Sequence, residues 1–239
     1  MLLLWHSFCF IHMIIFDIIT IFPDIFDSYF SKGMVARARK KSVIGIKVRD
    51  LRQFTSDNHR SVDDKPFSGG AGMILKVEPI YLAVEAAKKE AAKKEKVLTL
   101  LFSASGKKFT QEMARKWTKY DRIVMVCGRY EGVDARVGKY IADEEISIGD
   151  YVLTGGEIPA MVVVDSISRL LPGVINEESL ADESFNKIGQ KKLLEYPQYT
   201  RPEIFTAHNG KKWRVPKILL SGNHKLIEEW KKKKSQTIK

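Results

Sequence analysis

Residues 148–173 read IGDYVLTGGEIPAMVVVDSISRLLPG and join a glycine-rich loop directly to an apolar helix. Three glycines in this loop leave backbone N–H and C=O groups open to a ligand. Pro159 suits the first helical turn, and Pro172-Gly173 ends a helix that we expect over about 158–171. The pattern predicts either a ligand-binding loop or an ordinary tight loop before a buried helix.

Apolar strand-like runs alternate with helix-like segments along most of the chain. The strands are expected at 14–22, 43–48, 97–102 and 123–127, and the helices from about 24, at 79–96 and at 110–119. This alternation predicts an α/β fold with a parallel sheet, whose ligands bind beyond the carboxyl ends of the strands. We therefore expect the loops at 102–106, 128–132 and 148–155 to line one crevice.

The charge of the chain is concentrated near its end. The net charge is +11, and residues 211–239 hold ten Lys or Arg against two Glu. A basic segment can be only a solvated surface, but an excess this local favours a partner rich in phosphate. There is no G-x-G-x-x-G after a strand and no Walker A motif, so nucleoside triphosphate chemistry is not supported.

The cysteines and the N-terminus indicate a cytoplasmic protein. Cys9 and Cys127 form neither a metal-ligand spacing nor a disulfide framework, which is typical of a reducing compartment. Residues 1–12 are apolar but lack a positive n-region and a cleavage site, and the run is too short to span a membrane. We interpret them as an upstream extension and expect no membrane association.

Composition also divides the chain into parts. Residues 13–175 carry the α/β pattern, 176–190 form a polar linker, and 191–239 are expected to be a small, mostly helical second domain. Within the first part, residues 55–72 show no periodicity, and a stretch of that length is usually a functional loop or disordered.

Seven blocks, in order, resemble the bacterial tRNA (guanine-N1)-methyltransferase family of the SPOUT superfamily. Besides the opening stretch they are IFPDIF at 21–26, HRSVDDKPF at 59–67, GGAGM at 69–73, CGRYEGVDARV at 127–137, YPQYTRPE at 196–203 and LLSGNH at 219–224. The resemblance begins at Met13 and reaches Trp230. It implies a knotted parallel sheet flanked by helices, a homodimer, and S-adenosylmethionine as methyl donor.

The implied reaction methylates N1 of the guanosine just 3′ of the anticodon of tRNA (position 37). It requires a base for the N1 proton and a cation for charge developing on O6. The family's catalytic arginine matches Arg169, which could instead only pair with Asp165 one turn earlier. Its general base matches Glu183, although a gap in the linker would put Asp182 there, and either could be an ordinary solvated acid.

The resemblance also assigns the binding residues. The cofactor pocket maps onto Phe102, Gly128, Glu131, Ile148, Gly149, Asp150, Tyr151, Val152 and Leu153. The tRNA contacts map onto His59, Arg60, Tyr199, Arg201, Asn223 and His224. No residue is assigned to a metal, since Asp63-Asp64 is better explained by a basic partner, and the magnesium implied by the family would arrive with the RNA. Two alternatives stay open: the same fold with another target nucleotide, and a non-catalytic RNA-binding module.

Overall fold

The computed structural model describes residues 13–176, 184–185, 187–188 and 191–237. The chain divides into two compact units, 1–175 and 176–239, which are described separately. Residues 1–12, predicted to be an extension, and the acids at 182 and 183 lie outside the described residues.

The first unit is built on a five-stranded sheet of order β2-β1-β6-β5-β7. Its strands are β1 (Ile14–Thr20), β2 (Ile44–Asp50), β5 (Val97–Lys108), β6 (Arg122–Val126) and β7 (Glu144–Ser147). All neighbouring pairs are parallel, which confirms the predicted α/β class. The knot stays a prediction.

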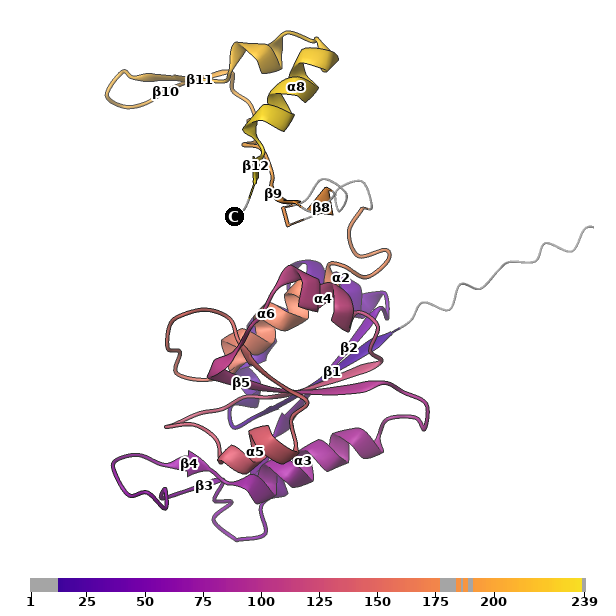
Figure 1. Ribbon diagram of the computed structural model, residues 1–239, viewed down its shortest axis with the longest axis vertical. Coiled ribbons are helices and arrows are strands. Elements are labelled where there is room, and N and C mark those ends of the chain that lie inside the picture. Colours follow the sequence, from indigo (N-terminus) through magenta and orange to yellow (C-terminus); the bar gives the residue numbers. More distant parts are fainter. Residues whose placement is uncertain (1–12, 177–183, 186, 189–190, 238–239) are drawn as a thin grey trace, which may run out of the picture. The chain divides into compact units, whose positions relative to one another are not determined.

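Helices cover both faces of this sheet (Figure 1). α3 (Val77–Lys89) and α5 (Ala135–Tyr140) lie on one face, and α2 (Gly33–Lys40), α4 (Gln111–Trp117) and α6 (Glu157–Ser168) lie on the other. Two short turns of helix, η1 (Pro23–Phe26) and α1 (Asp27–Phe30), follow β1. Each layer has its own core: Phe16 and Ile18 belong to one and Ile19 to the other, as expected when a parallel strand is buried on both faces.

Strand β5 is longer than the predicted strand at 97–102. Its pairing with β7 shifts register between Phe102 and Lys107, so residues 103–106 form a bulge inside the strand rather than a plain exit loop. Gly106 makes this possible, because a Cβ there would lie 2.5 Å from the backbone nitrogen of Ile146. A bulge re-aims the side chains that it carries, and here they belong to the site described below.

A buried ionic network crosses the sheet beside α3. Asp17, fully buried in β1, accepts a hydrogen bond from Arg49 Nε of β2 at 2.6 Å and pairs with Arg122 of β6. Arg49 Nη1 and Lys47 Nζ extend the network to the Glu90 carboxylate, at 2.9 and 2.6 Å. These hydrogen bonds, the one from Arg49 first, lower the pKa of Glu90 to about 2. The network joins three neighbouring strands to the end of α3.

Two connections differ from the predictions. The helix expected at 79–96 is α3, which begins two residues earlier and ends at Lys89. The stretch 55–72 follows η2 (Leu51–Phe54) and contains β3 (Asp63–Asp64), which pairs antiparallel with β4 (Ile74–Leu75) just beyond it. Pairs of two residues are too short to leave a periodic signal in the sequence.

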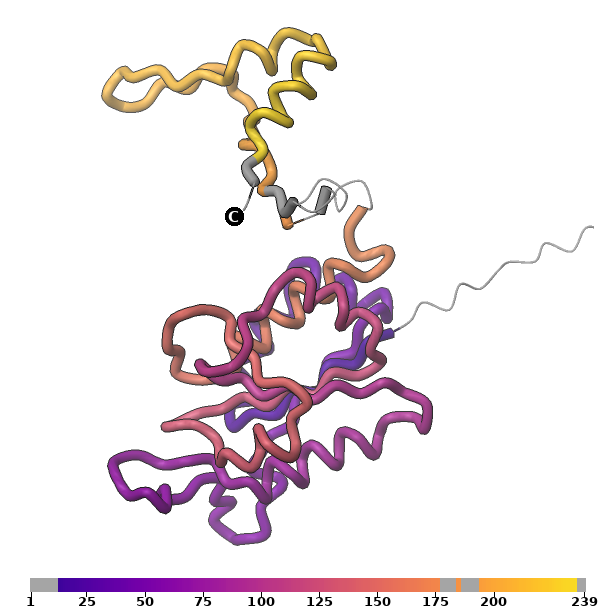
Figure 2. The backbone as a smooth tube through the Cα atoms, viewed as in Figure 1, coloured from indigo at the N-terminus to yellow at the C-terminus, as the bar shows by residue number. Residues whose placement is uncertain are grey.

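The second unit mixes helix and strand. Its helical parts are η3 (Lys217–Leu220) and α8 (His224–Lys234), and its strands are β8 (Lys187–Ile188), β9 (Lys191–Leu194), β10 (Ile204–Thr206), β11 (Lys212–Arg214) and β12 (Gln236–Thr237). Figure 2 shows the hairpin of β10 and β11 extending away from α8. The prediction of a mostly helical domain is therefore wrong for the described residues, because strands this short resemble loops in sequence. No helix among the described residues is long and apolar enough to cross a membrane.

Candidate functional site

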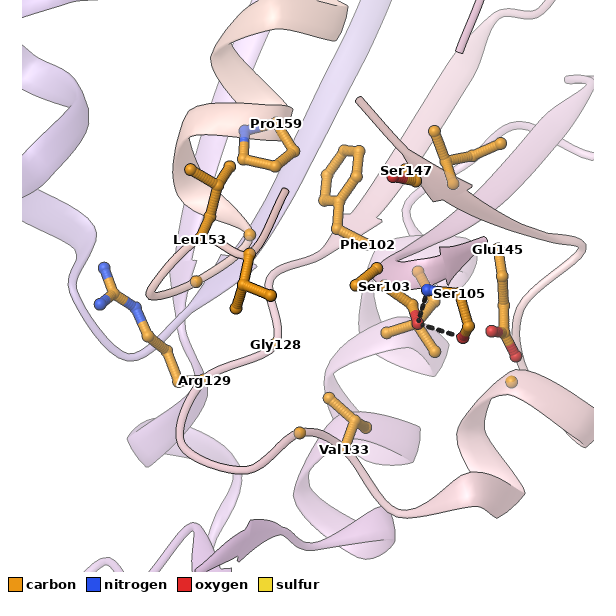
Figure 3. Close-up of a pocket in the computed structure, with 18 of the residues that line it drawn as sticks. Phe102, Ser103, Ser105, Gly128, Arg129, Val133, Glu145, Ser147, Leu153 and Pro159 are labelled. Carbon is orange, nitrogen blue, oxygen red and sulfur yellow. Dashed lines mark hydrogen bonds between the residues drawn. The ribbon is translucent and has the colours of Figure 1, made fainter. Parts of the chain in front are cut away.

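A cavity of about 520 Å³ opens beyond the carboxyl ends of β5, β6 and β7. Each of the three predicted loops, 102–106, 128–132 and 148–155, contributes to its lining. Figure 3 shows Phe102, Leu153 and Pro159 together on one side, with Val133 across from them. The crevice expected from the alternation of strands and loops is therefore present.

Eight of the nine residues predicted to bind the cofactor line this cavity: Phe102, Gly128, Glu131, Ile148, Gly149, Tyr151, Val152 and Leu153. Asp150 is the exception. Its side chain is 80% exposed and its carboxylate lies 2.5 Å from Lys108 Nζ. This surface ion pair holds the Asp150 side chain outside the lining of the cavity, and the assignment of Asp150 to cofactor binding stays a prediction.

The loop after β6 is held by backbone pairing to residues 73–75. The Glu131 N–H donates to Met73 O at 3.1 Å, Leu75 N–H to Gly132 O at 3.1 Å, and Asp134 N–H to Leu75 O at 3.0 Å. A Cβ on Gly72 would overlap the side chain of Glu131. The GGAGM block at 69–73 therefore packs against the Glu131 side chain and belongs to the site.

The glycine-rich loop after β7 is pressed against the end of β6. The Gly156 N–H donates to Gly128 O at 3.0 Å, and a Cβ on Gly156 would lie 2.6 Å from Cys127 Cα. Ser147 Oγ donates to Gly149 O at 2.9 Å. The loop between these anchors keeps Val152 88% exposed, so apolar surface is open to a ligand at the cavity mouth.

An ion pair that the sequence did not reveal closes the base of this loop. Glu157, 1% exposed at the start of α6, accepts from Arg129 Nε at 2.9 Å and from Thr20 Oγ1 at 2.7 Å. Arg129 lies 4.8 Å from the Phe22 ring centre and donates to Thr154 O at 3.3 Å. Because the partners are 28 and 137 positions from Glu157, no local pattern could have identified them.

Several further lining residues were also missed. The bulge in β5 presents Ser103 and Ser105, whose hydroxyl oxygens are 2.8 Å apart (Figure 3). Glu145 of β7 lines the cavity beside Gly138, where a Cβ would overlap its carboxylate. The cavity thus offers hydroxyls, carboxylates and bare backbone to a ligand. The Ser-x-Ser sequence in the loop predicted after the strand at 97–102 was the signal that could have identified Ser103 and Ser105.

Cys127 lies beneath the cavity and is a poor nucleophile. Its thiol is buried, and its pKa is raised well above the ordinary value by burial and by the nearby Glu157 carboxylate. A thiol in this state remains protonated. The residue serves as a small apolar floor against which Gly156 packs.

Arg169 does not line the cavity. It caps the C-terminal end of α6, ten residues beyond Pro159, and a helical rise of about 1.5 Å per residue separates the two by roughly 15 Å. Arg169 shares one helix face with Ile158, Val162 and Asp165, spaced three and four residues apart. Asp165 accepts a hydrogen bond from Tyr29, and burial followed by this carboxylate raises the Tyr29 pKa.

The predicted tRNA contacts lie in three places. His59 and Arg60 are exposed in a turn where Asp57 accepts from the Ser61 N–H at 3.1 Å, and they do not line the cavity. Tyr199 and Arg201 line a hollow of about 590 Å³ in the second unit.

Asn223 and His224 begin α8. The Asn223 side chain accepts from the Leu226 N–H at 3.2 Å as a helix cap, so this asparagine has a structural role. His224 is the first helical residue and is exposed. The described residues contain no group of three or more His, Cys, Asp or Glu that could hold a metal ion.

The chain is similar to known proteins in sequence and in structure. A family model described as tRNA (Guanine-1)-methyltransferase TrmD matches residues 14–238. The tRNA (guanine-N(1)-)-methyltransferase of Carboxydothermus hydrogenoformans is 47% identical over 92% of this chain and 81% of its own length. That of Dictyoglomus turgidum is 49% identical over 93% and 85%. The crystal structure of tRNA (m1G37) methyltransferase from Aquifex aeolicus aligns with a TM-score of 0.73 and 41% identity over 91% of this chain and 87% of that chain.

Proposed function

Because the chain belongs to the tRNA (guanine-1)-methyltransferase family, we propose that it transfers a methyl group from S-adenosylmethionine to N1 of a guanosine in tRNA, the one just 3′ of the anticodon. The observation that carries this proposal is the convergence of three glycine-containing loops on one cavity at the carboxyl edge of a parallel sheet. In sheets of this kind ligands bind at that edge.

The cavity residues suit S-adenosylmethionine. A volume of about 520 Å³ lies within the usual range for ligand sites. The backbone of residues 148–153 offers donors and acceptors for an adenine ring, and the Glu131 carboxylate suits a methionine ammonium group. The bound cofactor supplies an activated methyl group, so the protein needs only to orient the guanine and manage its proton and charge.

Those two tasks fall to an acid and a cation. We assign Arg169 to the stabilisation of negative charge on guanine O6, and Glu183, with Asp182 as the alternative, to the acceptance of the N1 proton. Magnesium, where it is required, would accompany the phosphates of the tRNA.

The exposed face of α6 supports a homodimer. Ile158 is 52% and Val162 36% exposed, although the opposite face of α6 is fully buried, and a helix that is apolar all round is normally covered. Phe22, Ile25 and Tyr29 add exposed apolar surface from the neighbouring η1 and α1. We propose that a second copy covers this face about a two-fold axis.

Such a dimer also explains the distance of Arg169 from the cavity. If two α6 helices pack antiparallel about the axis, the C-terminal end of one approaches the N-terminal end of the other. Arg169 of each copy then lies near the cavity of its partner, whereas the length of α6 separates it from the cavity of its own chain.

The second unit and its basic segment are assigned to tRNA binding. Residues 211–239 supply ten Lys or Arg against two Glu, which suits phosphate neutralisation and makes binding salt-dependent. We place the protein in the cytoplasm, where tRNA is available and a free thiol such as Cys127 stays reduced.

The test is transfer of labelled methyl from S-adenosylmethionine to two tRNA transcripts that differ only in guanosine or adenosine 3′ of the anticodon. We expect product only with guanosine. Equal transfer to both transcripts would indicate another target nucleotide. Binding of tRNA without any transfer would indicate an RNA-binding module and overturn the proposal.

A further inference from the structure

The hairpin of β10 and β11 carries an uncovered pair of aromatic rings. Phe205 lies directly opposite Trp213 in the antiparallel register, with ring centres 5.3 Å apart and planes at 40°. Phe205 is 49% and Trp213 58% exposed. Large rings exposed together mark an interaction surface more often than isolated ones do.

The hairpin has a defined geometry. Its turn is closed by hydrogen bonds from Gly210 N–H to Ala207 O at 2.8 Å and from Ala207 N–H to Lys211 O at 2.9 Å. Gly210 has φ +77°, a conformation that glycine adopts without strain. At the base, Val215 N–H donates to Glu203 O at 3.0 Å. The register of the two rings is therefore fixed from both ends.

The hollow of the second unit adjoins the base of the hairpin. Glu203 lies two residues before Phe205 and Val215 two residues after Trp213, and the hydrogen bond at the base joins their backbones. Glu203 and Val215 also line the hollow of about 590 Å³, together with Tyr199, Thr200, Arg201, Leu219 and Leu220. Hollow and ring pair form one surface, which we call the hairpin platform.

The charge around the rings identifies the partner class. Residues 204–214 include Lys211, Lys212 and Arg214 and no acid, and Glu203 is the one carboxylate in the lining of the hollow. Rings that accept stacked bases, flanked by cations that meet phosphates, are the combination used to bind unpaired nucleic acid. A protein interface would instead deplete charge around its central rings.

We propose that the hairpin platform stacks unpaired bases of RNA, with Phe205 and Trp213 as the stacking pair and Lys211 and Arg201 beside the backbone. The inference rests on the proposed function, because it specifies how the second unit holds the tRNA. Stacking on aromatic rings is tolerant of sequence, so the platform adds affinity rather than the choice of guanosine.

The test compares the tRNA affinity of the unmodified full-length protein with that of three variants at fixed salt. The double variant Phe205→Leu/Trp213→Leu keeps apolar volume but removes both rings, and we expect its affinity to fall about 10-fold or more. The double variant Phe205→Tyr/Trp213→Phe keeps two rings and should stay close to the unmodified protein. Tyr140→Leu removes a ring that is even more exposed, at 71%, beside Lys139 in the first unit, and it should leave affinity unchanged. Equal affinity of the leucine variant and the unmodified protein overturns the platform.

A second readout follows the indole itself. Single-stranded oligouridine should quench tryptophan fluorescence in the unmodified protein, and Trp213→Phe should remove most of that quenching while the oligonucleotide still binds. Quenching that persists in Trp213→Phe contradicts the proposal. So does a leucine variant that changes only the oligomeric state in sedimentation, because this would make the hairpin a protein interface.

These results are separable from the proposed function. Absence of methyl transfer by the unmodified protein, with ring-dependent RNA binding intact, would overturn the reaction and leave the platform standing. Normal guanosine-specific transfer, together with tRNA binding that does not depend on the rings, would overturn the platform and leave the reaction standing. Binding of S-adenosylmethionine reports that the first unit is folded in the hairpin variants, and circular dichroism of each variant reports whether the second unit keeps its fold.

Discussion

Arg129 Nε lies 2.9 Å from Glu157 Oε2, and this ion pair joins the loop after β6 to the first turn of α6. Thr20 at the end of β1 donates to the other oxygen of the same carboxylate. Three segments that are distant in sequence therefore meet at one buried acid. The glycine-rich loop between residues 148 and 156 takes its position from this junction.

Removing either partner of this pair should destabilise the first unit. Glu157→Gln leaves the largely buried Arg129 guanidinium without its counter-charge, and Arg129→Met leaves a buried carboxylate, at a cost of about 3 kcal/mol each. The double variant should cost less than the two single changes together, because it leaves no lone charge. Urea unfolding of the three variants measures this, and strictly additive losses would show that the pair is not coupled.

Gly156→Ala should weaken both stability and cofactor binding. Its φ of −84° is ordinary, so the penalty comes only from the Cβ, which would meet the Cys127 backbone at 2.6 Å. Overpacking of this kind costs about 1–3 kcal/mol. Gly128→Ala is the matched change in the same cavity, where the nearest atom is a side-chain methyl of Val133 at 3.1 Å rather than backbone. We expect thermal unfolding and S-adenosylmethionine titration to rank Gly156→Ala as the worse; the reverse order would contradict this packing.

In Glu90→Gln the free energy of unfolding should fall less steeply at acid pH than it does in the unmodified protein. The pKa of Glu90 is lowered from 4.5 to about 2, so its ion pairs stabilise the fold above about pH 4.5, and this contribution is lost as the pH falls towards 2. The effect should be small and salt-sensitive, because the side chain is 42% exposed. Glu85→Gln on α3 is the control. Unfolding free energies at neutral and acid pH measure it, and an unchanged slope in Glu90→Gln would refute it.

Arg169→Ala should retain S-adenosylmethionine binding and lower methyl transfer by about 10²–10³-fold, as expected when one preorganised cation is lost. Glu183→Gln should lower transfer by a similar factor, and Asp182→Asn should be milder. The measurement is single-turnover transfer to saturating tRNA. If Asp182→Asn loses most of its methyl transfer and Glu183→Gln loses little, Asp182 is the base. Full activity in all three variants would refute the mechanism.

Mixed dimers test where Arg169 acts. Gly128→Val fills the cavity of its own subunit but keeps Arg169, whereas Arg169→Ala keeps the cavity. If Arg169 serves the partner's cavity, co-expression of the two inactive forms should restore one working site per mixed dimer. No recovery would place Arg169 at the cavity of its own chain.

The sequence predicted the sheet and the cavity because both follow from local pattern. Buried parallel strands are continuous apolar runs, and the loops that follow them must meet at one edge. The ion pair at Glu157 could not be predicted, since its partners lie in other elements. That the Asp150 side chain lies outside the cavity lining could not be predicted for a related reason: its partner Lys108 lies nearby because β5 continues past the bulge.

The second unit was harder to predict because its strands are short. β10 and β11 have three residues each, and all of them are exposed, so no buried periodicity marks them. The Asn209-Gly210 pair was the available hairpin signal. The role of Asn223 as a helix cap shows in turn that a residue matched to a binding motif can be needed for the fold.

We propose that the cavity between the three loops serves methyl transfer to guanine N1. This is measured by nucleoside mass spectrometry of a tRNA transcript after one turnover with S-adenosylmethionine, with fragments that locate the modified position. We expect 1-methylguanosine at the position just 3′ of the anticodon, and its loss when Gly128→Val fills the cavity. A methyl group on another atom or nucleotide, or full product from the filled variant, would contradict it.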